Sequence, residues 1–236
     1  MAEYKLRSFG EIIDPQHTIV LVHELLNAFV APGGRSDTQG MRMDVSHIVP
    51  ATTKLLSAAR KAGVRVAYLC WTIFPDGRTQ NIWLRPHSAG PEDSPGLPNR
   101  VFRDSRWGAP PEPEHLELSP VEGTWGGEVL GSVAPEAGDW VIRKYRPDAF
   151  FATTLDAFLR WNGFQTIIIL GLGSEVGIVP TLISAAHRGY FRVAVSDCLR
   201  ASNLERTDDA MRYIADYAVL KTHVEIIDTW QTAPER

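Results

Sequence analysis

Polar and glycine residues follow strand-like apolar segments at four places in the sequence. They are His23 and Glu24 after residues 18–22, Lys144 after 140–143, the segment GLGSEVG at 171–177 after 166–170, and Asp197 and Cys198 at the end of 191–198. A carboxylate can transfer protons, and an ammonium group can balance its charge. A glycine-rich turn before a helix offers backbone N–H groups that hold an oxyanion. Together these groups could form a hydrolytic site.

Strand-like and helix-like segments alternate along most of the chain, which predicts how these groups are positioned. Strands are expected over residues 18–22, 64–71, 140–143, 166–170 and 191–197, with a last strand or strands within 218–227, and helices over 49–62, 153–162, 176–188 and 205–217. Strand–helix–strand repetition with short links is typical of a parallel sheet covered by helices on both faces. Because ligands of such sheets bind outside the carboxyl ends of the strands, the polar groups should meet at one edge.

The segment 74–138 differs from the rest because it is rich in proline and glycine and poor in apolar residues. Structureless segments of this length are uncommon and often functional. We interpret it as a long loop excursion from the sheet, within a single domain that spans residues 1–236. Chains of about 200–250 residues often form one α/β domain.

Composition excludes several classes of protein. The 236 residues carry 24 basic and 28 acidic side chains, a net charge of −4, and no long basic stripe, so neither nucleic acid nor an anionic membrane is an expected partner. Two cysteines are too few for a disulfide scaffold. The longest apolar run has six residues, and the first 14 residues lack an apolar signal region. We expect a cytoplasmic protein.

Two long segments carry a resemblance to a known family. They are TIVLVHELLNAFVAPGG and RKYRPDAFFATTLDAFLRWNGFQTIIILGLGSEVGIVPTLISAAHRGYFRVAVSDCLRA. The pattern, from about Thr18 to Ala201, resembles the isochorismatase-like, or cysteine-hydrolase, superfamily. The resemblance implies a three-layer α-β-α fold, with a six-stranded, mostly parallel, Rossmann-like sheet between helices.

Most members of that superfamily use an Asp–Lys–Cys triad, and the resemblance assigns its three positions here to Glu24, Lys144 and Gly177. The lysine is present, the carboxylate is one methylene longer, and the thiol is missing. Neither cysteine of the chain is an easy substitute, because Cys70 lies within a predicted strand and Cys198 lies beyond another.

Isochorismatases proper resemble this chain in having glycine at the thiol position. They cleave a vinyl ether by protonating a carbon atom, after which water adds to the oxocarbenium ion. The resemblance therefore implies that Glu24 is the acid/base, Lys144 supplies electrostatic stabilisation, and no thiol is used. It also implies a cis peptide bond before Gly173, and N–H groups of Gly173 and Gly177 that face the substrate. The alternatives are a helix-terminal carboxylate at Glu24, a solvated lysine and simple turn glycines.

No metal or other cofactor is expected. The segment HELLN at 23–27 begins like the zinc motif HExxH, but its fifth residue is Asn27 and it leaves a strand instead of lying on a helix. Metal-dependent relatives carry an Asp and paired His after the second strand, where this chain has Trp71, Thr72, Ile73 and Phe74.

Aromatic and arginine side chains are the candidate substrate contacts. Phe29, Trp71, Trp83 and Trp125 could line a pocket for a flat molecule, and Arg78 or Arg85 could pair with a substrate carboxylate. An aromatic core and exposed surface arginines are the alternatives, and both are common.

The first interpretation is a cofactor-free hydrolase of a small cyclic or aromatic substrate, with or without a carboxylate, in which water is the nucleophile. Hydrolysis of a vinyl-ether type is favoured. A thiol-independent hydrolase of an amide or cyclic amide is one alternative, and a catalytically inactive small-molecule-binding protein is another. A homo-oligomer, either a dimer or a tetramer, is expected by resemblance.

Overall fold

The computed structural model describes residues 7–75, 113–202 and 204–232, and the chain forms two compact units. The first, here called the sheet unit, consists of residues 1–25, 43–70 and 129–236. The second consists of residues 26–42 and 71–128. The expected single domain is not tested by this division and stays a prediction.

The sheet has six strands in the order β3-β2-β1-β4-β5-β6, all parallel. The strands are β1 (Thr18–His23), β2 (Arg65–Trp71), β3 (Trp140–Lys144), β4 (Thr166–Leu172), β5 (Phe191–Arg200) and β6 (Val219–Lys221). Every residue of the two central strands, β1 and β4, is buried. Burial on both faces explains why these strands are continuous apolar runs without alternation. The predicted α/β fold is confirmed, with a sheet that is entirely parallel.

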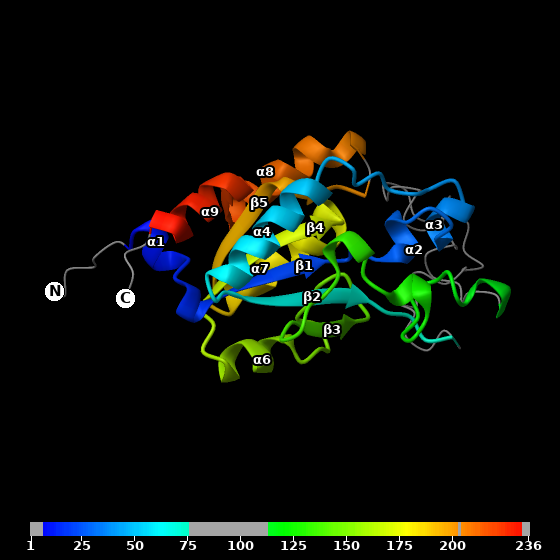
Figure 1. Ribbon diagram of the computed structural model, residues 1–236, viewed down its shortest axis with the longest axis horizontal. Helices are drawn as coiled ribbons and strands as arrows, with labels where there is room; N and C mark the ends of the chain where they lie inside the picture. The colour runs from blue at the N-terminus through cyan, green and yellow to red at the C-terminus, as the bar shows by residue number, and fades with distance from the viewer. Residues whose placement is uncertain (1–6, 76–112, 203, 233–236) are drawn as a thin grey trace, which may run out of the picture. The chain divides into compact units, whose positions relative to one another are not determined.

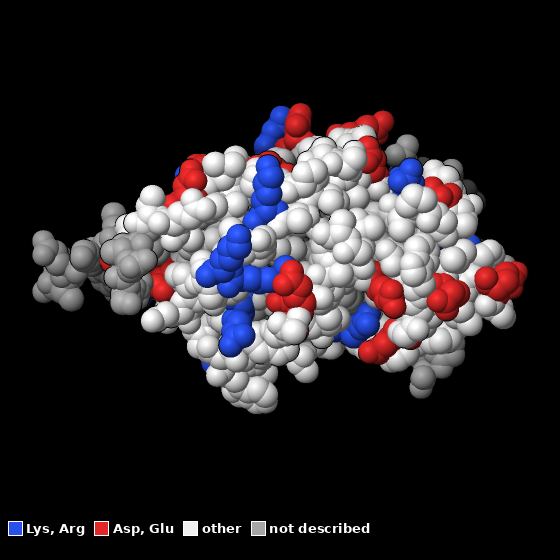
Figure 2. Space-filling view, in the orientation of Figure 1, with Lys and Arg blue, Asp and Glu red and all other residues white. Residues whose placement is uncertain are grey.

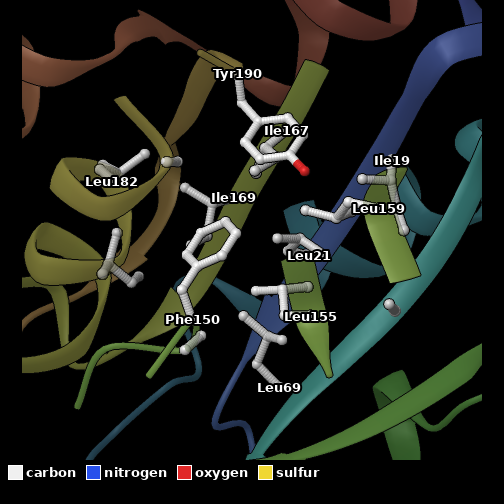
Figure 3. Close-up of a cluster of buried hydrophobic side chains, with 14 of the residues drawn as sticks. Ile19, Leu21, Leu69, Phe150, Leu155, Leu159, Ile167, Ile169, Leu182 and Tyr190 are labelled. Carbon is white, nitrogen blue, oxygen red and sulfur yellow. The ribbon is translucent and has the colours of Figure 1, made fainter. Parts of the chain in front are cut away.

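Helices cover both faces of the sheet (Figure 1). They are α1 (Phe9–Ile12), α4 (Val49–Lys61), α6 (Leu155–Trp161), α7 (Val179–His187), α8 (Thr207–Tyr217) and α9 (His223–Thr232). Helix α4 packs with α9, while α7 packs with α8. The apolar side chains of α6, α7 and α8 meet Ile19, Leu21, Ile167 and Ile169 in one buried cluster (Figure 3). This cluster anchors the central strands, and thereby fixes where their carboxyl ends lie.

Three of the sequence predictions need correction at element ends. Strand β5 was expected to end at Asp197 but continues to Arg200. The helix expected over residues 176–188 consists of two parts. A π-helical turn, Ser174–Ile178, comes first, and α7 starts after it at Val179. Residues 223–232 form a helix, α9, although the last strand or strands had been expected within 218–227. The N–H and the imidazole of His223 both bond the Asp197 carboxylate, and this pairing starts α9 at a point that the apolar pattern does not mark.

In the second unit the structure describes two short helices, α2 (Asn27–Val30) and α3 (Arg35–Thr38), and two 3₁₀ turns, Pro113–His115 and Trp125–Gly127. The side-chain amide of Asn27 donates to the carbonyl of Trp125 (3.0 Å), and its backbone N–H donates to the carbonyl of Glu128 (2.9 Å). These bonds join segments about 100 residues apart in the sequence.

Basic and acidic side chains lie side by side on the face of the molecule that Figure 2 shows. Among the ion pairs of the described residues, Arg60 bonds Glu136 (2.5 Å) and Asp139 (2.6 Å). Within the described part of the chain, no helix is long and apolar enough to cross a membrane.

Candidate active site

Glu24 stands immediately after β1, at the carboxyl edge of the sheet. Its backbone is in the left-handed region (φ 55°), which non-glycine residues adopt infrequently, and its N–H donates to the carbonyl of Leu69 on β2 (3.0 Å). This conformation turns the chain out of the strand. The carboxylate is mostly buried, with 14% of the side chain exposed. A held, strained backbone beneath a nearly buried carboxylate is typical of a functional position.

Lys144, the last residue of β3, forms an ion pair with Glu24 through its Nζ atom and Oε1. The lysine is completely buried, and its ammonium group also donates to the carbonyls of Arg146 and Pro147 (3.2 Å each). An ammonium ion without water requires such partners, because an unpaired buried charge is very costly. The two predicted catalytic residues are therefore brought together by the ends of β1 and β3.

His23 is the third member of this group; the sequence placed it at the end of the first strand and in a failed zinc motif, but gave it no role of its own. Its ring is completely buried, and Nδ1 lies 2.7 Å from the carbonyl oxygen of Leu172. Burial is the main cause that lowers its pKa to about 4, so the ring is neutral at neutral pH. Since a carbonyl only accepts, Nδ1 carries the proton and Nε2 carries a lone pair. Nε2 has no hydrogen-bond partner among the described residues and lies 3.6 Å from Glu24 Oε1.

The glycine-rich turn after β4 winds around one carbonyl oxygen. Gly173 is left-handed (φ 72°, ψ 42°), and its carbonyl accepts from the N–H groups of Val176 (3.1 Å), Gly177 (2.7 Å) and Ile178 (3.1 Å). The N–H of Gly173 itself donates to the carbonyl of Arg200 (2.9 Å). The expectation that the N–H groups of Gly173 and Gly177 face a substrate is thus wrong for this structure, because both are used within the chain. The expected cis peptide bond before Gly173 is also absent, since no described peptide bond is cis.

Gly177 has no room for a side chain. A Cβ atom built there would lie 2.3 Å from Cε1 and 2.7 Å from Nε2 of His23. Such distances are far below van der Waals contact. The imidazole ring therefore occupies the space into which any side chain at position 177 would project.

At Gly173 there is room for one methyl-sized group, and three polar groups border this small space. A point one Cβ bond from Gly173 is 3.7 Å from Ser202 Oγ, 3.8 Å from the nitrogen of Gly177 and 3.9 Å from Glu24 Oε2. Ser202 was missed by the sequence analysis. The extension of β5 carries the chain to this edge, and the N–H of Ser202 donates to the Glu175 carboxylate (2.9 Å). A signal was present in the apolar residue Leu199, which continues the strand beyond Asp197.

Both cysteines of the chain lie in the interior, where burial acts on the thiol pKa. Cys70 and Cys198 are both buried, and burial is the main cause that raises the pKa of each thiol to about 12. Thiols with such pKa values are poor nucleophiles at neutral pH. Cys198 also lies inside β5 and not beyond it.

The remaining predicted contacts belong to the second unit or lie outside the described residues. Phe29 is buried on α2, and Trp71 and Trp125 are half-buried; all three belong to the second unit. Trp83, Arg78 and Arg85 lie outside the described residues. A role of these six in substrate binding stays a prediction. The described residues hold no group of three or more His, Cys, Asp or Glu side chains arranged to bind a metal ion.

Comparison with known proteins places this site in a family context. The model of the isochorismatase domain matches residues 12–226. The ureidoacrylate amidohydrolase RutB of Methylorubrum extorquens is 31% identical over 188 residues, which are 78% of this chain and 70% of that protein. The protein of the same name from Stutzerimonas stutzeri is 30% identical over 200 residues, 83% of this chain and 75% of the relative.

Solved structures show the same fold. A cysteine hydrolase from Pseudomonas syringae pv. phaseolicola superposes with a TM-score of 0.73 at 23% identity, covering 99% of this chain and all of the other. N-carbamoylsarcosine amidase from Thermoplasma acidophilum superposes with a TM-score of 0.62 at 24% identity, covering 87% of this chain and 96% of that chain.

Proposed function

From the premise that this chain belongs to the isochorismatase family of hydrolases, we propose that it hydrolyses a small cyclic or aromatic substrate without a thiol. Glu24 is the acid/base, and water is the nucleophile. The observation that carries the proposal is the buried ion pair of Lys144 and Glu24 at the carboxyl edge of the sheet. A buried charge pair next to a polar space can transfer protons without further cofactors.

The favoured reaction is hydrolysis of a vinyl ether. Protonated Glu24 gives its proton to the terminal carbon of the C=C bond, which leaves an oxocarbenium ion. Water adds to the carbon that bears oxygen, and the Glu24 carboxylate takes one proton from that water. The resulting hemiketal then collapses to a carbonyl compound and an alcohol. Lys144 stabilises the carboxylate that exists between the two proton transfers.

The turn geometry supports this choice. Hydrolysis of an amide passes through a tetrahedral oxyanion that requires preorganised N–H donors. The N–H groups of Gly173 and Gly177 already donate within the chain. Protonation of a vinyl ether develops positive charge on the substrate and needs no such donors.

Hydrolysis of an amide or cyclic amide is the second candidate, and the names of the relatives favour it. RutB of M. extorquens is called a ureidoacrylate amidohydrolase, and the structure from T. acidophilum is an amidase. In this reaction Glu24 would act first as a base, taking a proton from the water that attacks the carbonyl carbon, and then return it to the leaving nitrogen. The Nζ atom of Lys144 would balance the charge.

Turnover of a panel of vinyl ethers, amides and lactams tests the proposal. We expect at least one vinyl ether to be hydrolysed, and Glu24→Gln to lower kcat about 10²–10⁴-fold with little change in binding, because the amide keeps the size but cannot transfer a proton. Glu225→Gln, which breaks the surface pair of Glu225 and Lys221, is the control and should retain kcat. Near-full kcat in Glu24→Gln would contradict the assignment of the acid/base, and binding without turnover would indicate a binding protein.

A further inference from the structure

The ring of His23 is fixed on one side and unsatisfied on the other. Nδ1–H donates to the Leu172 carbonyl (2.7 Å), which sets the orientation of the ring and the tautomer. Nε2 is buried, carries a lone pair and lacks a hydrogen-bond partner in the described part of the chain. A buried acceptor without a donor is costly and requires a reason.

Oε1 of Glu24 lies 3.6 Å from this nitrogen. That distance is too long for a hydrogen bond. It fits a carboxylate oxygen that faces a nitrogen lone pair, since both atoms are acceptors. If the carboxyl group gains a proton, one of the two becomes a donor, and the contact can shorten to a hydrogen bond.

We propose that Nε2 of His23 accepts a hydrogen bond from the protonated Glu24 carboxyl group, so that His23 is the positioning residue that holds the proton of the catalytic acid. The proposal rests on the acid/base role of Glu24. Rotation of the carboxyl group by half a turn about the Cγ–Cδ bond then exchanges its two oxygen atoms. The proton moves away from His23 to the position of Oε2, which borders the space over Gly173.

Two neighbours thus act on Glu24 in opposite directions. The Lys144 ammonium favours the carboxylate, whereas a neutral acceptor at Nε2 favours the carboxylic acid. A group that must both give and take a proton needs this balance. The charged groups that act on His23 are Glu24 and Lys144, while Cys70 and Arg143 interact with the same cluster from β2 and β3.

Gly177 completes the arrangement because only glycine leaves room for the ring. A Cβ at position 177 would lie 2.7 Å from Nε2. The ring at position 23 and the missing side chain at position 177 are therefore two parts of one feature. The imidazole ring of His23 occupies the position that a side chain at residue 177 would take.

Titration of the Glu24 carboxyl carbon by ¹³C NMR, without substrate, tests the proposal. His23→Asn keeps a donor for Leu172 but removes the acceptor at the Nε2 position, and should lower the proton affinity of Glu24 about three- to tenfold. His23→Gln restores an acceptor near that position and should recover most of the loss. Lys144→Met, the control of opposite sign, should raise the affinity. Glu24→Gln identifies the Glu24 signal.

An unchanged Glu24 titration in His23→Asn would overturn the proposal. So would ¹⁵N spectra of the wild-type protein that place the ring proton on Nε2, a measurement that remains decisive if a variant fails to fold. Because neither experiment uses a substrate, its result is independent of the turnover assay, which tests the proposed function separately.

Discussion

The two halves of the carboxyl edge of the sheet are organised differently. At the ends of β1 and β3, three titratable side chains lie against one another, and the imidazole of His23 and the ammonium group of Lys144 both face Oε1 of the Glu24 carboxylate. At the ends of β4 and β5, the polar groups are mostly backbone, and the N–H groups of the turn are used to bind a single carbonyl.

Under the proposed function, this contrast predicts which of the two parts carries the chemistry. We call the groups at the ends of β1 and β3 the side-chain half and those at the ends of β4 and β5 the backbone half. The side-chain half is buried, and the low dielectric of the protein interior strengthens the interaction between its charges. The backbone half offers a small space bordered by Ser202 and Gly173 but no described pair of free N–H donors from the two glycines. Proton transfer by the first half, instead of oxyanion binding by the second, should therefore dominate. Each prediction below tests one side of the contrast.

Among the variants that follow, Lys144→Met is expected to have the largest effect, because it removes the charge on Lys144. Lys144→Met should lower kcat by about 2–4 kcal/mol of transition-state stabilisation, roughly 30- to 900-fold, because Glu24 loses the cation that stabilises its charged form. Lys221, which pairs with Glu225 on the surface, provides the control. Lys221→Met removes a similar pair in an exposed place and should leave kcat unchanged. Equal kcat for both variants would show that the side-chain half is not the catalytic one.

The second prediction concerns the stability of the same half at low pH. The pKa of His23 is lowered from 6.5 to about 4. Between these two pH values the unfolded chain binds a proton at this residue, whereas the folded chain does so only below about pH 4. Stability should then fall as the pH falls through this window, and His23 should account for about 2 kcal/mol of the loss between pH 7 and pH 5.

Urea unfolding at the two pH values measures this contribution. In His23→Asn the acid-dependent loss should be smaller by about 2 kcal/mol. The exposed residue His187 serves as control, and His187→Asn should leave the pH dependence as it is. If His23→Asn and the wild-type protein lose stability equally, the ring is not kept neutral by burial.

The sequence predicted that Glu24 and Lys144 of the side-chain half would meet, because each follows or ends an apolar strand. Glu24 and Lys144 follow β1 and β3 directly, and parallel strands bring their carboxyl ends to one edge. No role was predicted for His23, because a histidine at the end of a strand carries no distinctive pattern. Its importance depends on contacts with Leu172 and Gly177, which lie about 150 residues away in the sequence.

The backbone half could not be predicted in the same detail. The register of β5 against β4 shifts between Ile169 and Gly171, and this irregularity lengthens β5 to Arg200 and brings Ser202 to the site. Likewise, the π-helical turn at 174–178 decides which N–H groups are free. Both features arise from hydrogen bonding between segments, which local apolar patterns do not encode.

The third prediction tests the contact between the two halves. Gly177→Ala would place a Cβ 2.3 Å from His23 Cε1 and should lower the free energy of unfolding by about 1–3 kcal/mol. Gly131, which has no atom within 4 Å of its Cβ position, is the matched control. Gly131→Ala should change stability by less than about 0.5 kcal/mol. In a His23→Ala background the cost of Gly177→Ala should largely vanish, whereas a persistent cost would place the clash elsewhere.

The smallest effect, none at all, is expected from blocking the thiols. Because the pKa values of Cys70 and Cys198 are raised to about 12, only about one thiol in ten thousand is ionised at pH 8, and both side chains are buried. Iodoacetamide should therefore leave the native protein unmodified and its turnover intact, while both cysteines should react in urea, as mass spectrometry can verify. The result separates two explanations of the glycine at position 177. If a cysteine from elsewhere in the chain had taken over the role of nucleophile, activity would disappear in step with the alkylation of Cys198. If the ring of His23 has replaced a side chain at position 177 and catalysis depends on proton transfer by Glu24, the reagent has no thiolate to attack and the rate does not change.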